Sequence, residues 1–200
     1  LVDYVVTEAG FGADLGAEKF MNIKCGYSGL KPDALVLVAK IRVLRHHGGA
    51  KKTEYNTPDL VRVKKGFENL EKHIENCKKF GLTPVVAINH FKTDTTEEIE
   101  FVMSECAKHG VMALLSDCWA RGGEGMRELA QAVVDIIESG VNRFKPLYDW
   151  NIPVEEKIMT IAKEIYGAED VEYSPKAREG LKVIKELGFD KLPVCMAKTQ

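Results

Sequence analysis

Cysteines are few and scattered in this sequence, and long apolar runs are missing. The five cysteines are an odd number and include no Cys-x-x-Cys pair, which argues against a disulfide framework or a zinc site and favours reduced thiols. No apolar run approaches the roughly 20 residues that a membrane span needs. The N-terminal residues carry neither the basic region nor the cleavage site of a signal peptide. The sequence therefore predicts a cytoplasmic protein with no membrane partner.

An excess of charge of one sign is also lacking, since 28 Lys and Arg residues stand against 30 Asp and Glu residues, for a net charge of −2. This balance provides no strong basic field, so we expect no nucleic-acid partner. A hydrophobic content of 45% is enough for a packed core, and 200 residues correspond to one large or two small domains. Three hydrolase patterns are absent, namely a Ser-His-Asp order, HExxH and GxSxG.

Short apolar runs alternate with amphipathic segments along the chain. Strands are predicted at 3–8, 33–39, 84–89, 111–115 and 192–197. Helices are predicted from a glycine-rich loop to about residue 25, and then over 57–81, 95–110, 126–140, 154–167 and 174–187. Two of the helix starts carry capping signals, which are Thr57-Pro58 and the capping box of Thr95 and Glu98.

This alternation predicts an α/β fold of three layers, with a mostly parallel sheet and helices on both of its faces. We assign residues 1–140 to an α/β core portion. Residues 141–200 are interpreted as a helical linker or subdomain with a returning strand. Whether that last part packs as its own subdomain or rejoins the same sheet is left open by the sequence.

Unusual residues follow three of the predicted strands, in the loops 8–19, 89–94 and 117–125. The ligand crevice of an open parallel sheet lies at the carboxyl ends of its strands. Phe11, Phe91 and Trp119 stand in these loops, where exposed rings would hold a flat ligand by stacking. The alternative is that the three rings are core residues. The strand-end position also makes His90 a candidate site residue.

The glycine-rich loop Gly10–Gly16 has the pattern G-x-G-x-x-x-G between a predicted strand and a predicted helix. Its backbone N–H groups could cradle a phosphate, as in phosphate or dinucleotide binding. It is not the P-loop pattern G-x-x-x-x-G-K-[ST], and no acidic residue clearly closes the next predicted strand. A plain tight turn is the alternative interpretation.

Longer motifs carry a resemblance to a known family. The segment Val6–Phe20, VTEAGFGADLGAEKF, with Ile23–Cys25 after it, resembles the signature of formate–tetrahydrofolate ligase, also called formyltetrahydrofolate synthetase. Similar matches continue in order to the last segment, LPVCMAKTQ, so that the resemblance covers essentially the whole chain. It implies a P-loop NTPase-like lineage and an enzyme that joins formate to tetrahydrofolate through formyl phosphate, giving 10-formyltetrahydrofolate, ADP and phosphate. It also implies ATP with Mg²⁺, a monovalent cation such as K⁺ or NH₄⁺, and a homotetramer.

The resemblance assigns the folate-binding residues as well. The aromatic residues that lie against the pterin ring in the family correspond here to Phe11, Phe91 and Trp119. Leu115, just before the Trp loop, is the expected apolar neighbour in that pocket.

Polar contacts are expected from Glu8, Asp14 and Lys19 near the glycine-rich loop, although Glu8 and Asp14 could equally accept hydrogen bonds from loop N–H groups. His90 stands where Ala is common in the family, so it could alter the pterin contacts or their pH dependence. The resemblance assigns no catalytic residue and no metal ligand within this chain.

The family's P-loop belongs to a segment that would precede this sequence, and the family continues beyond Gln200. We therefore expect a fragment that carries the folate side of the enzyme and is inactive in isolation. Two other functions remain open at this point. The chain could be a non-catalytic assembly or regulatory module of the same fold, or a nicotinamide-dinucleotide oxidoreductase that uses the glycine-rich loop.

Overall fold

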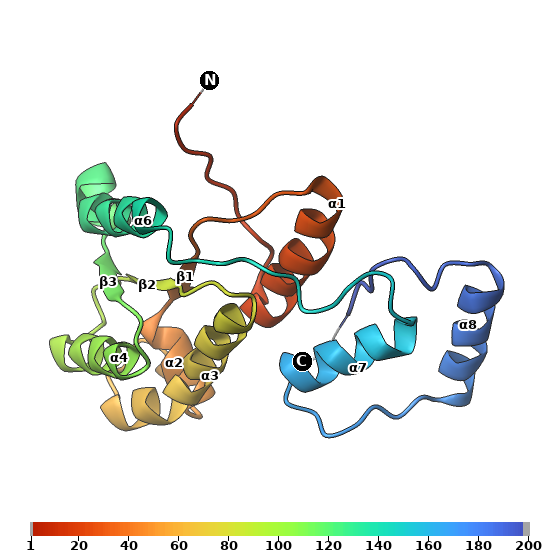
Figure 1. Ribbon diagram of the computed structural model, residues 1–200. Coiled ribbons are helices and arrows are strands. Elements are labelled where there is room, and N and C mark those ends of the chain that lie inside the picture. The colour runs from red at the N-terminus through yellow and green to blue at the C-terminus, as the bar shows by residue number, and fades with distance from the viewer. Residues whose placement is uncertain (1, 198–200) are drawn as a thin grey trace. The chain divides into compact units, whose positions relative to one another are not determined.

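The computed structural model describes residues 2–197, which fall into two compact units (Figure 1). The sheet unit is Pro32–Phe144, and the helical unit combines the chain up to Lys31 with the chain from Lys145 onward. The N-terminal segment is thus grouped with the C-terminal one, whereas the sequence pattern places it with the sheet.

The sheet unit is built on three parallel strands in the order β1 (Val36–Ala39), β2 (Val85–Asn89) and β3 (Ala113–Ser116). Val38 pairs with Ala87, which in turn pairs with Leu114. The three strands coincide with predicted apolar runs, and their parallel pairing confirms the predicted α/β fold.

Helices cover both faces of this sheet, as Figure 1 shows. The α6 helix (Arg127–Ser139) lies on one face, where Leu129 and Ala132 form a buried cluster with Val85 and Ala87 of β2. The alternate residues of β2 are also fully buried and point to the other face. That face carries α2 (Ile41–His47), α3 (Leu60–Lys79) and α4 (Thr96–Lys108). The short elements of the unit are η3 (Lys52–Glu54), α5 (Cys118–Arg121) and η4 (Gly122–Met126).

Glycine allows α2 and α3 to pack with their backbones in contact. A Cβ atom on Gly66 of α3 would overlap the carbonyl oxygen of Leu44 in α2. A Cβ atom on Gly48, which ends α2, would overlap the carbonyl oxygen of Arg62. The absence of both side chains therefore sets the distance between the two helices.

The capping signals had different outcomes. The predicted capping box of α4 is confirmed, because Glu98 N donates to the Thr95 side chain and Thr95 N donates to the Glu98 carboxylate. The predicted start of α3 at Thr57-Pro58 is wrong. The helix begins at Leu60, and the Asp59 carboxylate caps it by accepting a 3.0 Å hydrogen bond from the backbone N–H of Arg62.

The helical unit contains η1 (Gly12–Ala17), η2 (Phe20–Cys25), α1 (Gly26–Ser28), α7 (Val154–Glu164) and α8 (Pro175–Glu186). The predicted helix after the glycine-rich loop is present, but most of it has π-type hydrogen bonding. The predicted start of α8 is confirmed, with Ser174 accepting a hydrogen bond from Ala177 N.

Two predicted strands, 3–8 and 192–197, are wrong as far as the structure describes them. An extended segment becomes a strand only when another strand takes up its backbone hydrogen bonds. Near the second segment, side chains take up the backbone hydrogen bonds instead. Lys157 Nζ donates to the carbonyl oxygens of Asp190 and Leu192, and Val194 N donates to the Tyr148 hydroxyl.

In residues 2–197, no helix has the length and apolar character required to cross a membrane.

Candidate functional site

The carboxyl ends of β1, β2 and β3 meet at one edge of the sheet unit. Asn89, the last residue of β2, pairs with Ser116, the last residue of β3. One residue later, His90 N donates a 3.0 Å hydrogen bond to the Ser116 carbonyl oxygen. The loops that follow β2 and β3, which hold Phe91 and Trp119, therefore leave the sheet side by side.

The loop after β2 is a tight turn that fixes the backbone of Phe91. Phe91 N donates to the Asp94 carboxylate, and Asp94 N donates to the Phe91 carbonyl oxygen, both at 2.9 Å. The half-buried Phe91 ring has the guanidinium carbon of Arg42, from α2, only 3.5 Å from its centroid. Both the backbone and the ring of Phe91 thus have defined contacts.

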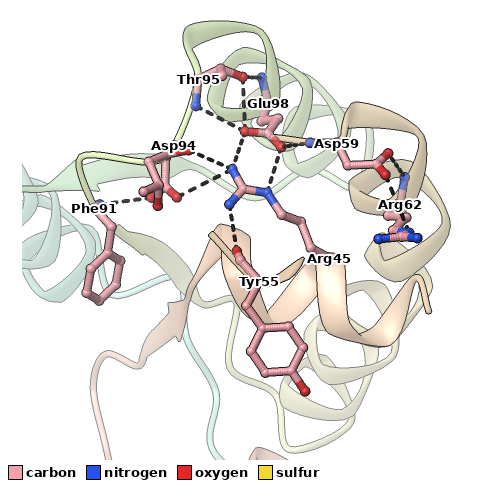
Figure 2. Close-up of polar contacts among 9 residues, drawn as sticks. Arg45, Tyr55, Asp59, Arg62, Phe91, Asp94, Thr95 and Glu98 are labelled. Carbon is pink, nitrogen blue, oxygen red and sulfur yellow. Dashed lines mark hydrogen bonds and ion pairs between the residues drawn. The ribbon is translucent and has the colours of Figure 1, made fainter. Parts of the chain in front are cut away.

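A buried ion-pair network also holds this turn, through the Asp94 carboxylate and the Thr93 carbonyl oxygen, as Figure 2 shows for Asp94. Arg45 of α2 is fully buried and pairs with both oxygens of Glu98, at 2.8 Å from Nε and 2.6 Å from Nη2. Its remaining donors reach the carbonyl oxygens of Tyr55 and Thr93, at 2.8 and 2.9 Å. In the figure the Phe91 ring points away from this network.

The pKa values of the two carboxylates in the network, Glu98 and Asp94, are shifted in opposite directions. Burial alone would raise the pKa of Glu98, but hydrogen bonds from Arg45, Thr95 and Asp59 lower this pKa to about 2. The Asp94 carboxylate lies farther from Arg45, at 3.7 Å, and one of its buried oxygens has no hydrogen-bond partner. Burial therefore raises the pKa of Asp94, despite the hydrogen bond from Phe91 N and the charge of Arg45.

The loop after β3 presents an exposed aromatic ring. Trp119 lies in the short helix α5 with 84% of its surface exposed, so it is not a core residue of this unit. Leu115, the other residue predicted here, is half-buried in β3. Asp117 follows β3 directly, and its carboxylate lies 3.6 Å from Nδ1 of His90. The structure thus brings His90, Phe91, Leu115 and the start of the Trp119 loop to one edge of one sheet.

Phe11 belongs to the helical unit, so its grouping with Phe91 and Trp119 stays a prediction. Its ring is 98% exposed, which excludes a core role within its own unit. Among the predicted polar residues of this region, Glu8 is exposed, Lys19 is half-buried and Asp14 is buried.

The glycine-rich loop folds tightly onto itself. A Cβ atom on Gly16 would overlap the backbone of Gly10, and Gly12 has a φ of +76°. These features favour the tight-turn interpretation of the loop.

Two further features of the helical unit were not predicted. Glu18 is fully buried and accepts a 2.8 Å hydrogen bond from Asn22, while burial raises the pKa of its carboxyl group. A hollow of about 380 Å³ is lined by Gly26 and by residues 146–150. A Cβ atom on Gly26 would lie 2.8 Å from the Trp150 ring, so the glycine makes room for that ring.

The comparison with known families agrees with the motifs. A family model described as formate–tetrahydrofolate ligase matches residues 1–200, which is the whole of this sequence. The substrates that this family implies are formate, tetrahydrofolate and ATP. The long Val6–Phe20 motif and the match over all 200 residues lead to one conclusion, that the chain belongs to the formate–tetrahydrofolate ligase family.

Proposed function

We propose that the edge of the sheet unit formed by Phe91, Leu115 and Trp119 binds the pterin ring of tetrahydrofolate. The observation that carries this proposal is the exposure of Trp119 at the strand edge where Phe91 is held by a tight turn. A pterin is flat with a polar rim, so aromatic faces position it and a few polar groups fix its edge. His90 and Asp117, whose side chains lie 3.6 Å apart, supply polar groups at the same edge of the sheet. Phe11 is the third ring that the family resemblance assigns to the pterin.

The reaction we propose for the whole enzyme proceeds through formyl phosphate. The N10 amine of the folate attacks the formyl carbon, the new C–N bond forms, the bond from carbon to the phosphate oxygen breaks, and the amine proton is released. The contribution of the sheet edge is to hold the amine in a defined orientation, which is a proximity effect. Among residues 2–197, no group of three or more His, Cys, Asp or Glu side chains is placed so that it could hold a metal ion.

We also propose that these 200 residues alone bind folate without turning over ATP, because the sequence lacks a G-x-x-x-x-G-K-[ST] segment. Use of a monovalent cation and assembly into a homotetramer are proposals that rest on family membership, whereas the proposed cytoplasmic location rests on the sequence features described above.

The experiment is a titration of tetrahydrofolate monitored by Trp119 fluorescence in a Trp150→Phe background. We expect saturable quenching, with an affinity for tetrahydrofolate that is weakened but still measurable in Phe91→Leu. Phe189→Leu is the matched control, because Phe189 is 52% exposed and belongs to the helical unit. Free N-acetyltryptophanamide corrects for light absorbed by the folate. A folded protein without saturable quenching would refute the proposed pterin site.

A further inference from the structure

Arg42 contacts the ring that the proposed pterin site uses. Its guanidinium carbon lies 3.5 Å from the centroid of Phe91, at the distance of face-to-face stacking. The planar guanidinium group stacks well on aromatic faces and is attracted by their π electrons. One face of the Phe91 ring is therefore covered by α2, and only the opposite face is left for a ligand.

Arg42 has no competing polar partner in the part of the chain that the structure describes. Its Nε atom is buried without a hydrogen bond, and no ion pair to Arg42 is found among residues 2–197. Arg45 lies three residues later on the same helix and forms four hydrogen bonds. The two arginines thus differ in role, since Arg45 fixes the backbone around the loop, whereas the Phe91 ring is what holds the Arg42 side chain.

We propose that Arg42 is a positioning residue for folate binding, which acts by holding the Phe91 ring in the orientation that stacks on the pterin. This inference rests on the proposed pterin site. The backbone of Phe91 is already fixed by Asp94, so the remaining freedom is rotation of its side chain. A guanidinium group on one face restricts that rotation before the ligand arrives, and affinity increases when a site is ordered in advance.

The stack exists with and without the ligand, so its effect on affinity is limited to the side-chain freedom of Phe91 that it removes in advance. Ordering one side chain on binding costs about 0.5–1.5 kcal/mol. We therefore expect Arg42→Met to weaken tetrahydrofolate binding by about twofold to about tenfold. Arg42→Lys keeps the positive charge and loses the planar group, so it should recover part of the loss.

The test is a double-mutant cycle on the full chain, again in the Trp150→Phe background and with tetrahydrofolate as the probe. Arg42→Met, Phe91→Leu and the double variant are titrated, and Arg178→Met on exposed α8 is the control for loss of one positive charge. If Arg42 acts through Phe91, Arg42→Met weakens binding in the parent and adds nothing in the Phe91→Leu background. The thermal midpoints of the single variants are measured alongside, so that a loss of affinity is separated from a loss of folding.

Three outcomes would contradict the proposal in distinguishable ways. Equal weakening by Arg42→Met in both backgrounds would mean that Arg42 acts independently of Phe91. No weakening in the parent would mean that the stack has no role in binding. If Phe91→Leu itself leaves affinity unchanged, the proposed pterin site fails, and the Arg42 proposal fails with it.

Discussion

Replacing Glu98 by Gln tests how strongly the buried network supports the loop after β2. Glu98 accepts five hydrogen bonds, two from Arg45, two from Thr95 and one from Asp59 N. A Gln side chain has nearly the same shape, but it carries an NH₂ group in place of one acceptor oxygen. At least two donors would then face another donor, and the fully buried Arg45 would keep only the more distant Asp94 carboxylate as a counter-ion.

The expected cost of Glu98→Gln is about 3–5 kcal/mol of unfolding free energy, as for other buried ion pairs that lose one partner. That is a large part of the 5–15 kcal/mol that stabilises a typical domain. Urea unfolding at pH 7 measures it, and Glu97→Gln is the matched control because Glu97 is exposed on the same turn of α4. A loss below about 1 kcal/mol would refute the reasoning, since Arg45 would then be stable without the charge.

The same carboxylate makes a pH prediction. The pKa of Glu98 is lowered from its ordinary 4.5 to about 2 in the folded protein. A lowered carboxyl pKa adds stability that is complete above the unfolded pKa and is lost as the pH falls through the folded one. We therefore expect stability to decrease between about pH 4.5 and about pH 2, and this part of the decrease to be absent in Glu98→Gln. Unfolding midpoints in urea across this range would show it, and identical pH profiles for the two proteins would contradict it.

Three other predictions concern the packing of helices, the anchoring of the C-terminal segment and the capping of α4. Gly66→Ala should destabilise the sheet unit by about 1–3 kcal/mol in urea unfolding, because its Cβ atom would overlap the Leu44 carbonyl oxygen. The control Gly180→Ala, at an open position of α8, should increase stability by up to about 1 kcal/mol. If both variants increase stability, α2 and α3 are not in close contact. Lys157→Met leaves the carbonyl oxygens of Asp190 and Leu192 without their donor, so trypsin should cleave after Lys191 faster than in the parent; an unchanged rate would count against that anchor. Thr95→Ala removes the α4 cap and should lower the unfolding free energy by about 1 kcal/mol in the same assay, well below the loss in Glu98→Gln. An equal loss in the two variants would mean that the cap contributes as much stability as the buried ion pair.

Local patterns predicted the elements whose signals lie within a few residues. The apolar runs gave β1, β2 and β3, and the capping box gave the start of α4. The predicted strand at 3–8 failed because strand formation depends on a partner elsewhere in the chain. Val5 and Val6 have the residue types of a strand but are 83% and 93% exposed and unpaired in the described chain. The π-type hydrogen bonding after the glycine-rich loop has no signal in the residue types either.

The candidate site divides in the same way between local and distant information. Strand ends are readable from the sequence, and the rule that parallel strands end at one edge predicted Phe11, Phe91 and Trp119 as candidates. The family resemblance added Leu115. The groups that hold this edge were missed because their partners are far away in sequence. Arg45 and Glu98 are 53 positions apart, and Glu98 was identified only through its local capping role.

The ion pair explains why one residue can have both a local and a distant role. A capping glutamate is normally exposed and contributes little beyond its own helix. In this chain the α4 start lies against α2, so the carboxylate that caps one helix also neutralises a buried arginine of the other. The turn that holds Phe91 ends where α4 begins, and the residue that stacks on Phe91 comes from α2. The position of the proposed pterin-stacking ring is therefore set by the ion pair between α2 and the start of α4, which no single segment of the sequence encodes.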